Sequence, residues 1–277
     1  MGETKTPSAE WLYEIRQREK AHAYAKWRME HSPSVEELKE QRLHIFPYAP
    51  LISIVVPVYN TEPTYLSAFI ESVLAQTYAN LELCLADGAS NKESALACLT
   101  EYVQRDARIK VIRLPQNKGI SGNTNEAILQ STGEYVAFCD HDDLLEPNAL
   151  FEAVKIINER KAELIYTDED KINEDTTVFY EPRRKPDFSP EKLTACNYIC
   201  HLVVVKRRLL DEAGLLDPHF DGSQDHELVL RLSEHTQHIA HIPKILYHWR
   251  QFGASMSKQH LEECQAKGRA AVKEHLL

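Results

Sequence analysis

The chain has 277 residues, 43% of them hydrophobic and 27% charged, which is the composition of an ordinary globular protein large enough to bury a full core. The formal net charge of −10 excludes a protein that binds nucleic acid nonspecifically, because such binding relies on a basic surface. No apolar run approaches the roughly 18 residues of a membrane-spanning helix, and no apolar stretch follows Met1 as in a secretory signal. We therefore expect a cytoplasmic protein.

The first part of the chain, residues 8–45, is predicted to be helical. It is highly charged with scattered apolar residues such as Trp11 and Trp27, and Ser34 followed by Glu37 has the spacing of a capping box that starts a second helix. The first helix also carries several basic residues. A membrane surface, a partner helix and its own domain are three environments that fit it, and the last is the simplest.

Two prolines, Pro47 and Pro50, indicate a linker after these helices. We therefore expect a helical N-terminal extension over residues 1–48 and one main domain over residues 49–277.

From residue 51 onward, β-branched apolar runs alternate with amphipathic stretches. The predicted strands are 51–58, 81–86, 109–114, 135–139 and 164–167, and the predicted helices are 63–77, 93–104, 121–130 and 147–160. This alternation is typical of a parallel sheet with helices on both faces. A less regular second part predicts strands at 198–205 and 245–249 and helices at 225–234 and 258–277. In such sheets ligands bind at the carboxyl ends of the strands, so the loops there are the ones to examine.

The six cysteines indicate neither a disulfide nor a zinc site. Cys84 and Cys139 fall in predicted buried strands, where a free thiol behaves as a small hydrophobe. Cys196 and Cys200 are four residues apart, but no second pair has zinc-ligand spacing.

The loop after the first predicted strand, Pro57-Val-Tyr-Asn-Thr-Glu62, contains no glycine. A dinucleotide-binding fold has Gly-x-Gly-x-x-Gly at this point, and an NTPase has a glycine-rich loop that ends in Gly-Lys-Ser/Thr. A pyrophosphate here would therefore be held by something else, and a metal ion is the obvious candidate. The same loop argues against a sugar nucleotidyltransferase, which needs a glycine-rich basic loop for a triphosphate.

Three aspartates, Asp140, Asp142 and Asp143, follow the fourth predicted strand. Carboxylates at the end of a buried strand repel one another and are costly to desolvate unless a cation or protons compensate them. Mg²⁺ and Mn²⁺ take oxygen ligands and commonly bridge carboxylates to diphosphate oxygens. The alternative is that one aspartate caps the helix that begins near Pro147. Capping suits Asp143 but accounts for one acid only, so we predict a metal and ribose role for the other two.

Several motifs stand at the ends of the predicted strands and in the second half of the chain. The first group is Val-Pro-Val-Tyr-Asn, Ala86-Asp-Gly-Ala-Ser90, Asn117-Lys-Gly-Ile-Ser-Gly-Asn-Thr-Asn125 and Asp140-His-Asp-Asp143; the second is Tyr166-Thr-Asp-Glu-Asp-Lys171, Lys185-Pro-Asp-Phe-Ser-Pro190, Asn197-Tyr-Ile-Cys-His201, Gly222-Ser-Gln-Asp225 and Tyr247-His-Trp-Arg250. In order and number they resemble the family 2 glycosyltransferases with the GT-A fold, and most of all bacterial enzymes of O-antigen and rhamnose-rich polysaccharide assembly. The resemblance spans roughly residues 45–255.

This resemblance implies an α/β GT-A fold, which is Rossmann-like with a mostly parallel central sheet, preceded here by the helical extension. It also implies a nucleotide-diphosphate-sugar donor, a glycan or lipid-linked glycan acceptor, and Mn²⁺ or Mg²⁺ as cofactor. By position, Asp225 corresponds to the general base, Asp140 faces the ribose, Asp142 coordinates the cation near Asp140, and His248 approaches the metal diphosphate. The residues expected around the donor are Pro57, Tyr59, Asn60, Glu62, Asp87, Lys118, Gly119, Asn123, Asp140 and His141.

Plainer interpretations stand beside these roles. Asp225 begins a predicted helix and could simply be its cap instead of a base. His248 could be a structural histidine, and Lys118 could be an exposed turn residue rather than a phosphate contact. The basic clusters 183–185 and 206–208 could meet phosphates of a lipid-linked acceptor, but solvated faces are the favoured interpretation.

The chain departs from the resembled pattern at two positions. Gly88 stands where many members have a second acid that contacts uracil, which leaves the base of the donor open. Gln224 stands where many have glutamate, but only the second acid of that pair, Asp225, is needed as base.

The sequence thus predicts an inverting, metal-dependent glycosyltransferase of bacterial surface polysaccharide synthesis that uses dTDP-rhamnose or a UDP-sugar. The rival is a noncatalytic GT-A domain kept for binding or scaffolding. The prediction requires that the aspartates after the fourth strand hold the ion within reach of Asp225, so Asp142 and Asp225 must share one cleft.

Overall fold

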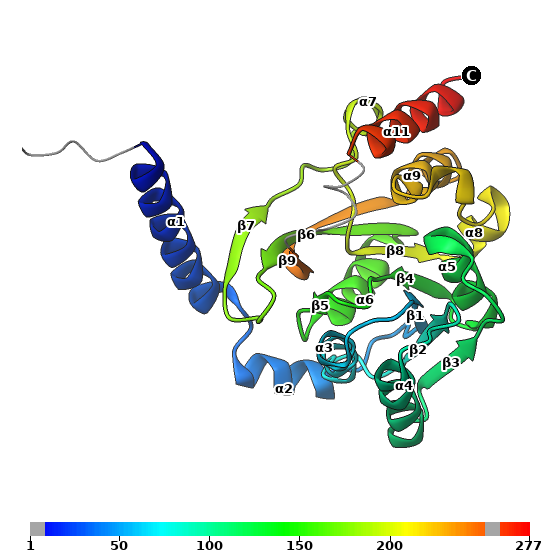
Figure 1. The fold of residues 1–277 in the computed structure, drawn as a ribbon, viewed down its shortest axis with the longest axis horizontal. Coiled ribbons are helices and arrows are strands. Elements are labelled where there is room, and N and C mark those ends of the chain that lie inside the picture. The colour runs from blue at the N-terminus through cyan, green and yellow to red at the C-terminus, as the bar shows by residue number, and fades with distance from the viewer. Residues whose placement is uncertain (1–8, 253–260) are drawn as a thin grey trace, which may run out of the picture.

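The computed structural model describes residues 9–252 and 261–277, with side chains from residue 19 onward (Figure 1). The side chain of Trp11 therefore lies outside the described part. The helices are α1 (Ala9–His31), α2 (Val35–Leu43), α3 (Pro63–Leu74), α4 (Glu93–Arg105), α5 (Gly119–Gln130), α6 (Ala149–Arg160), α7 (Pro190–Ala195), α8 (Arg207–Ala213), the 3-10 helix η1 (Pro218–Phe220), α9 (Gln224–Glu234) and α11 (Leu261–His275). The strands are β1 (Ile52–Val58), β2 (Leu81–Asp87), β3 (Ile109–Arg113), β4 (Tyr135–Phe138), β5 (Leu144–Leu145), β6 (Leu164–Ile172), β7 (Phe179–Arg183), β8 (Val203–Lys206) and β9 (Ile239–Arg250).

A nine-stranded sheet forms the centre of the molecule, in the order β3-β2-β1-β4-β8-β6-β9-β5, with β7 paired to β6. Strands β3, β2, β1 and β4 run parallel, as the alternating pattern predicts, and β6 and β9 are also parallel. β8 lies antiparallel between β4 and β6. The α/β class with a mostly parallel sheet is confirmed, and β8 marks the join between its two halves.

Helices cover both faces of this sheet because the side chains of each strand alternate between them. On β1, Ile54 and Val56 point into a core that includes side chains of α3, α4 and α6. Val55, between them, points into a second core that includes side chains of α5, α8 and α9. Each β1 side chain named here is fully buried, which explains why this strand reads as one continuous apolar run.

The second half of the sheet differs from the sequence prediction. β6 continues to Ile172 and β9 begins at Ile239, whereas the predicted strand 198–205 shortens to Val203–Lys206. The strands β5 and β7 and the helices α7 and α8 were not predicted. β6 was cut short because Thr167 to Asp170 is a polar run, and polar runs are typical of loops. In the structure these side chains are buried, with partners supplied by distant residues.

The N-terminal helix packs on its own domain, which is the simplest of the three environments considered for it. In its last turns the Tyr24 hydroxyl donates to Asp170 at 2.6 Å, and Arg28 forms ion pairs of 3.2 Å with Asp170 and Glu146. The guanidinium of Arg28 also lies 3.5 Å from the centre of the Phe179 ring on β7. Figure 1 shows α1 at the side of the molecule, next to β7. Among the described residues, no helix combines the length and apolarity needed to cross a membrane.

Candidate active site

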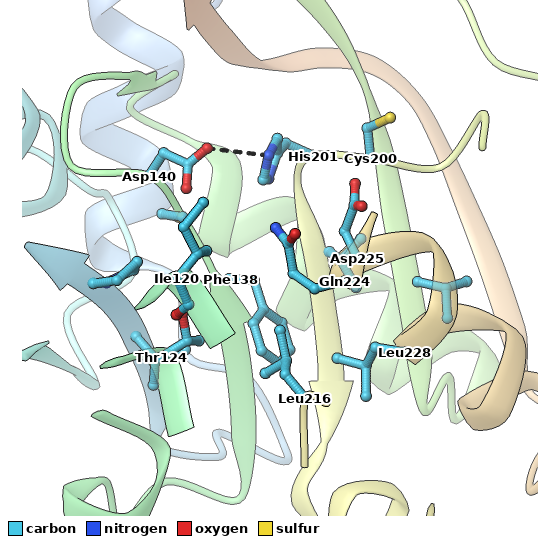
Figure 2. A pocket seen from close by; sticks show the side chains of 15 residues that line it. Ile120, Thr124, Phe138, Asp140, Cys200, His201, Leu216, Gln224, Asp225 and Leu228 are labelled. Carbon is cyan, nitrogen blue, oxygen red and sulfur yellow. Dashed lines mark hydrogen bonds and ion pairs between the residues drawn. The ribbon is translucent and has the colours of Figure 1, made fainter. Parts of the chain in front are cut away.

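A cavity opens at the carboxyl ends of β1 and β4, between α5, α9 and the loop that leads into β8 (Figure 2). Its space, including the part open to solvent, is about 500 Å³. The lining is mostly apolar. Its polar and ionisable side chains include Thr124, Asp140, His201, Gln224 and Asp225. An apolar cavity with a few polar groups at its mouth is typical of a small-molecule site.

Asp140 and His201 face each other at the mouth of this cavity. The imidazole Nε2 lies 3.4 Å from the Asp140 carboxylate. Burial opposes ionisation of Asp140, but His201 outweighs it and holds the aspartate pKa below its usual range. Burial would also lower the pKa of His201, but Asp140 reverses the shift and raises that pKa to about 9. His201 was not predicted as a site residue, although it ends the Asn197–His201 motif.

Tyr247 on β9 contacts both members of this pair. Its ring stacks on His201 with centroids 4.8 Å apart and 17° between the planes. Its hydroxyl accepts from the backbone N–H of Asp140 at 3.1 Å and donates to the carboxylate of Asp143 at 2.6 Å. One tyrosine thus contacts both the acidic turn and the histidine.

Asp143 has a structural role, but it is not a helix cap. Its carboxylate accepts from Tyr247 and from the backbone N–H of Arg250 at 2.7 Å. The following helix α6 begins at Ala149 with Asn148 as its N-cap, so the predicted capping role of Asp143 is wrong. Burial, together with the two neighbouring aspartates, raises the pKa of Asp143 well above its usual range.

Asp142 is partly exposed beside the cavity. About a quarter of its side chain is exposed, and its carboxylate lies 3.7 Å from Nδ1 of His141. Its backbone carbonyl accepts from Nε of Arg250 at 2.6 Å. Burial raises the pKa of Asp142. Asp142 does not line the cavity that Asp140 lines.

The carboxylates of the acidic turn fit a hard divalent cation whose remaining ligands come from the substrate and from water. Among the side chains that the structure describes, those of residues 19–252 and 261–277, no three histidine, cysteine, aspartate or glutamate residues form a closed metal site. Mg²⁺ in phosphate sites commonly takes only one or two carboxylates, and substrate phosphates and water complete its shell. Asp140 and Asp142 are two such carboxylates, in the crowded acidic turn where a cation would relieve repulsion.

His248, the third predicted metal ligand, has both ring nitrogens occupied. Nδ1 lies 2.5 Å from Asp170 and Nε2 lies 2.8 Å from Glu146. Burial disfavours the charged ring, but the two carboxylates outweigh burial and raise the pKa of His248. These contacts favour the structural alternative for this histidine.

Asp225, the predicted base, lies in the first turn of α9 and lines the same cavity as Asp140. The N-cap of α9 is Ser223, so a capping role for Asp225 is wrong. Its two oxygens accept hydrogen bonds from the Asn197 amide at 2.9 Å and from the backbone N–H of His226 at 2.8 Å. Asp140 and Asp225 line one cavity, whereas Asp142, the acid that was expected to share a cleft with Asp225, lies outside its lining.

The predicted nucleotide residues gather at the ends of β1 and β2. Pro57 lines the cavity, and Tyr59 beyond it is 46% exposed. Asn60 accepts from two backbone N–H groups of the loop after β2, and Glu62 pairs with Lys92. These contacts join the two loops into one surface.

Asp87, at the end of β2, holds an unused acceptor. One carboxylate oxygen accepts from the backbone N–H of Ser90 at 3.1 Å. The other is buried without a hydrogen-bond partner, and the nearest cation is Arg113 at 3.7 Å. A buried carboxylate oxygen that accepts no hydrogen bond is energetically costly, so this atom is suited to an N–H donor from a ligand.

The remaining residues predicted to contact the donor, Lys118, Gly119 and Asn123, lie in the turn at residues 117–123 and differ in their surroundings. The Lys118 ammonium pairs with Glu126 at 2.5 Å, which favours the exposed-turn interpretation. Gly119 has a φ of +79°, a conformation that favours glycine. The buried Asn123 amide donates to Asn117 at 2.9 Å, and a Cβ at Gly88 would lie 2.4 Å from the nitrogen of Asn123.

The two basic clusters turn inward more than the sequence suggested. The side chain of Lys185 is 1% exposed and pairs with Glu169 at 3.0 Å. Arg207 donates to the backbone carbonyl of Gly133 and to the hydroxyl of Ser131. The interpretation as solvated faces is therefore wrong for Lys185 and Arg207.

Solved structures share this architecture. Staphylococcus aureus TarS 1-349 in complex with UDP-GlcNAc aligns with a TM-score of 0.65 at 19% identity, over 79% of this chain and 65% of that one. The mannosyltransferase PcManGT from Pyrobaculum calidifontis, in complex with GDP-Man and Mn²⁺, aligns with a TM-score of 0.64 at 15% identity, over 86% and 70%. The chain therefore has the GT-A fold of these structures.

Residues 53–214 match the family model described as glycosyl transferase family 2, which is more than half of the chain. The chain belongs to glycosyl transferase family 2.

Curated relatives extend the comparison along the chain. The O-antigen biosynthesis protein RfbC of Myxococcus xanthus is 34% identical over 91% of this chain and 20% of its own length. The uncharacterized protein y4gI of Sinorhizobium fredii is 43% identical over 82% of this chain and 25% of its own. The chain thus spans a quarter or less of the length of these two relatives. The Escherichia coli β-1,3-glucosyltransferase WfgD, whose name gives UDP-Glc as donor, is 35% identical over 58% of this chain and 62% of its own length.

Proposed function

We propose that this chain is an inverting, divalent-cation-dependent glycosyltransferase that moves a sugar from a nucleotide-diphosphate donor to a glycan or lipid-linked glycan in bacterial surface polysaccharide assembly. The observation that carries this proposal is that Asp140 and Asp225 line one cavity at the carboxyl ends of β1 and β4. The catalytic domain is residues 49–277, and residues 1–48 are an extension of it. The reaction takes place in the cytoplasm or at the inner face of the membrane, where such acceptors are built.

The donor nucleotide lies over the ends of β1 and β2 in this proposal. The unpaired oxygen of Asp87 accepts from an N–H of the base, and Asp140 accepts from the ribose hydroxyls. Asp140 and Asp142 hold the cation. A bound Mn²⁺ or Mg²⁺ neutralises negative charge on the departing diphosphate.

Asp225 acts as general base. The acceptor hydroxyl oxygen attacks the anomeric carbon on the side opposite the diphosphate, its proton passes to the Asp225 carboxylate, and the bond electrons leave with the diphosphate. One displacement inverts the anomeric centre. The apolar lining of the cavity supports this step because it limits water near the reacting atoms.

The donor is a UDP-sugar or dTDP-rhamnose. UDP-sugars are supported by the ligand of the TarS structure and by the donor in the name of WfgD, and dTDP-rhamnose by the likeness to an O-antigen biosynthesis protein.

The test has two stages. Thermal-shift measurements with a nucleotide-sugar panel, with and without Mn²⁺, identify the donor, because a ligand that binds only the folded state raises the melting temperature. Donor hydrolysis or transfer is then measured for the wild type and for Asp225→Asn. We expect unchanged donor binding and a loss of turnover of about 10² to 10⁴-fold in the variant. Donor binding without turnover in the wild type would instead support a noncatalytic binding domain.

A further inference from the structure

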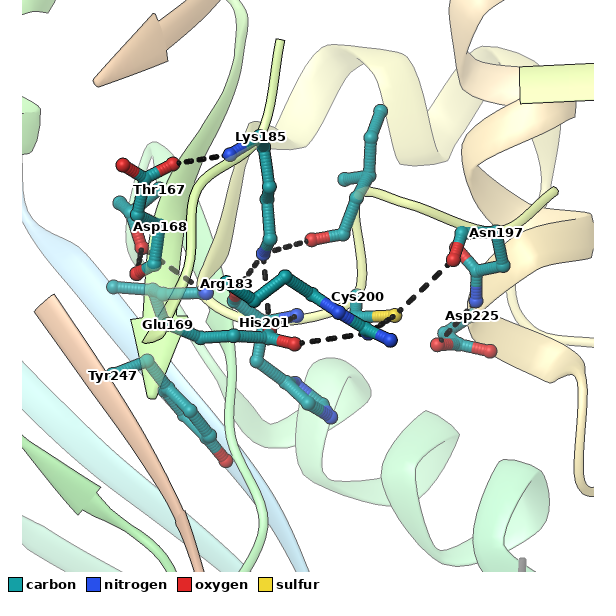
Figure 3. A network of polar contacts seen from close by, with 12 residues as sticks. Thr167, Asp168, Glu169, Arg183, Lys185, Asn197, Cys200, His201, Asp225 and Tyr247 are labelled. Carbon is teal, nitrogen blue, oxygen red and sulfur yellow. Dashed lines mark hydrogen bonds and ion pairs between the residues drawn. The ribbon is translucent and has the colours of Figure 1, made fainter. Parts of the chain in front are cut away.

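The loop between α7 and β8, residues 196–202, contacts both acids of the cavity. At one end Asn197 donates to the carboxylate of Asp225, and at the other end His201 faces Asp140. Figure 3 shows Asn197, Asp225 and His201 together with the network behind them, and Figure 2 shows His201 facing Asp140. Asp140 follows β4 and Asp225 lies in α9, so this loop bridges the two sides of the site.

A buried ion pair anchors the loop from behind. The Lys185 ammonium donates to Glu169 and to the backbone carbonyls of Ile199 and His201. Glu169 in turn accepts from the backbone N–H of His201 at 3.3 Å. Lys185 and Glu169 are almost fully buried, with side chains 1% and 5% exposed. The loop backbone is therefore held at several points, which limits the positions its side chains can take.

Asn197 presents its amide nitrogen to Asp225, because an ionised carboxylate can only accept hydrogen bonds. The amide holds one carboxylate oxygen and the backbone N–H of His226 holds the other. Two donors on different oxygens fix the plane of the carboxylate. An isolated aspartate in the first turn of a helix would rotate about its side-chain bonds instead.

Resting on the proposed function, we infer that Asn197 is a positioning residue for Asp225: its amide, on a loop anchored by Lys185 and Glu169, fixes the carboxylate toward the acceptor hydroxyl.

The chemistry around Asp225 explains why a neutral donor suits this position. Asp225 acts electrostatically on two ionisable groups of the loop, Cys200 and His201. Burial raises the pKa of the Cys200 thiol, so the thiol is neutral. An amide orients the carboxylate without adding a charge, whereas a second acid would repel it.

The experiment compares Asn197→Ala and Asn197→Asp with the matched control Cys196→Ser, a change at the neighbouring exposed residue. The readouts are kcat, KM and the dissociation constant for the nucleotide sugar that the wild type hydrolyses fastest in Mn²⁺. We expect kcat to fall roughly 10 to 100-fold in Asn197→Ala, because small displacements of reacting groups cost this much, with donor affinity within twofold of the wild type. Asn197→Asp loses more, and the control loses nothing.

The pH profile of kcat supplies a readout that a purely structural residue would not change. A carboxylate that loses a donor binds its proton more tightly, so the acid limb of the profile should move to higher pH in Asn197→Ala. A wild-type kcat together with an unchanged acid limb in Asn197→Ala would overturn the inference. A parallel loss of donor affinity and melting temperature in Asn197→Ala and Asn197→Asp would overturn it as well.

Asp225→Asn separates this inference from the proposed function. If Asp225→Asn retains wild-type turnover, the base assignment fails and the role of Asn197 fails with it. If Asp225→Asn is inactive while Asn197→Ala is normal, the base stands and only the positioning role is overturned.

Discussion

The phenol ring of Tyr247 lies parallel to the imidazole of His201 while its hydroxyl bonds to the Asp143 carboxylate. A strand at the far side of the sheet thereby holds both the acidic turn and the loop into β8. Tyr247→Phe keeps the stacked ring and removes only the hydroxyl. We expect a loss of unfolding free energy of about 1–3 kcal/mol, since a buried carboxylate loses its donor.

The same variant should weaken donor binding in Mn²⁺, because the backbone of Asp140 also loses its partner. Urea unfolding and calorimetry of donor binding measure the two effects. Wild-type stability together with wild-type donor affinity in Tyr247→Phe would contradict this role.

Lys185→Met leaves the buried Glu169 carboxylate without its ammonium partner. Removing one member of a buried ion pair typically costs about 3–5 kcal/mol, because the other charge stays desolvated. Lys39→Met changes the same residue types on the surface, where the pair with Glu36 spans 3.6 Å and both side chains are mostly exposed. We expect that control to change the unfolding free energy by less than about 0.5 kcal/mol. Equal losses in the two variants, measured by urea unfolding, would show that the pair is not what stabilises the loop.

Glu82 on β2 should make stability depend on pH in acid. Burial disfavours its charge, but hydrogen bonds from Lys110, Ser53 and the backbone of Thr132 outweigh burial and lower the pKa from 4.5 to about 2. A group with a lowered pKa in the folded state stabilises the protein above its unfolded pKa. This contribution is therefore complete above about pH 4.5 and is lost as the pH falls toward 2.

Urea unfolding between pH 6 and pH 3 measures this contribution. Glu82→Gln should be less stable than the wild type at pH 6, and the difference should narrow at pH 3. A difference that stays constant over this range would assign the effect to packing instead of charge.

Gly88 and Asn123 should behave as a coupled pair. A Cβ at residue 88 would lie 2.4 Å from the Asn123 amide nitrogen, which is itself bonded to Asn117. Gly88→Ala must therefore displace Asn123 and is expected to weaken binding of the nucleotide donor. Asn123→Ala makes room, so the double variant should bind better than Gly88→Ala alone, with a coupling energy of roughly 0.5–3 kcal/mol. Strictly additive losses in donor affinity would mean that the two side chains do not compete for this space.

The first half of the fold followed from local patterns. In β1 the period of two and the fully buried residues reflect cores on both faces, and α3 to α6 show amphipathic stretches between strands. Their boundaries differ from the predictions by a few residues at most, as the helix of residues 63–77 ends at Leu74. These elements pack on the layers next to them, and the spacing of their apolar residues indicates which face is buried.

The second half did not follow, because its polar residues are satisfied by distant parts of the chain. Asp168 is paired with His241 at 2.8 Å, and Asp170 with Tyr24 and His248. Without these partners the segment resembles a loop. For the same reason His201 received no role, since β8 had to be inserted antiparallel between β4 and β6 before His201 could face Asp140.

The contact of Arg28 and Tyr24 with Asp170 has a practical meaning for how this chain can be shortened. A polypeptide that started at residue 49 would keep Glu146, Asp170 and His248 next to one another but would lack the Arg28 guanidinium, which pairs with the two acids. Trimming the leading helix would thus remove a positive charge from this cluster, and protons or water would have to replace it beside the two carboxylates.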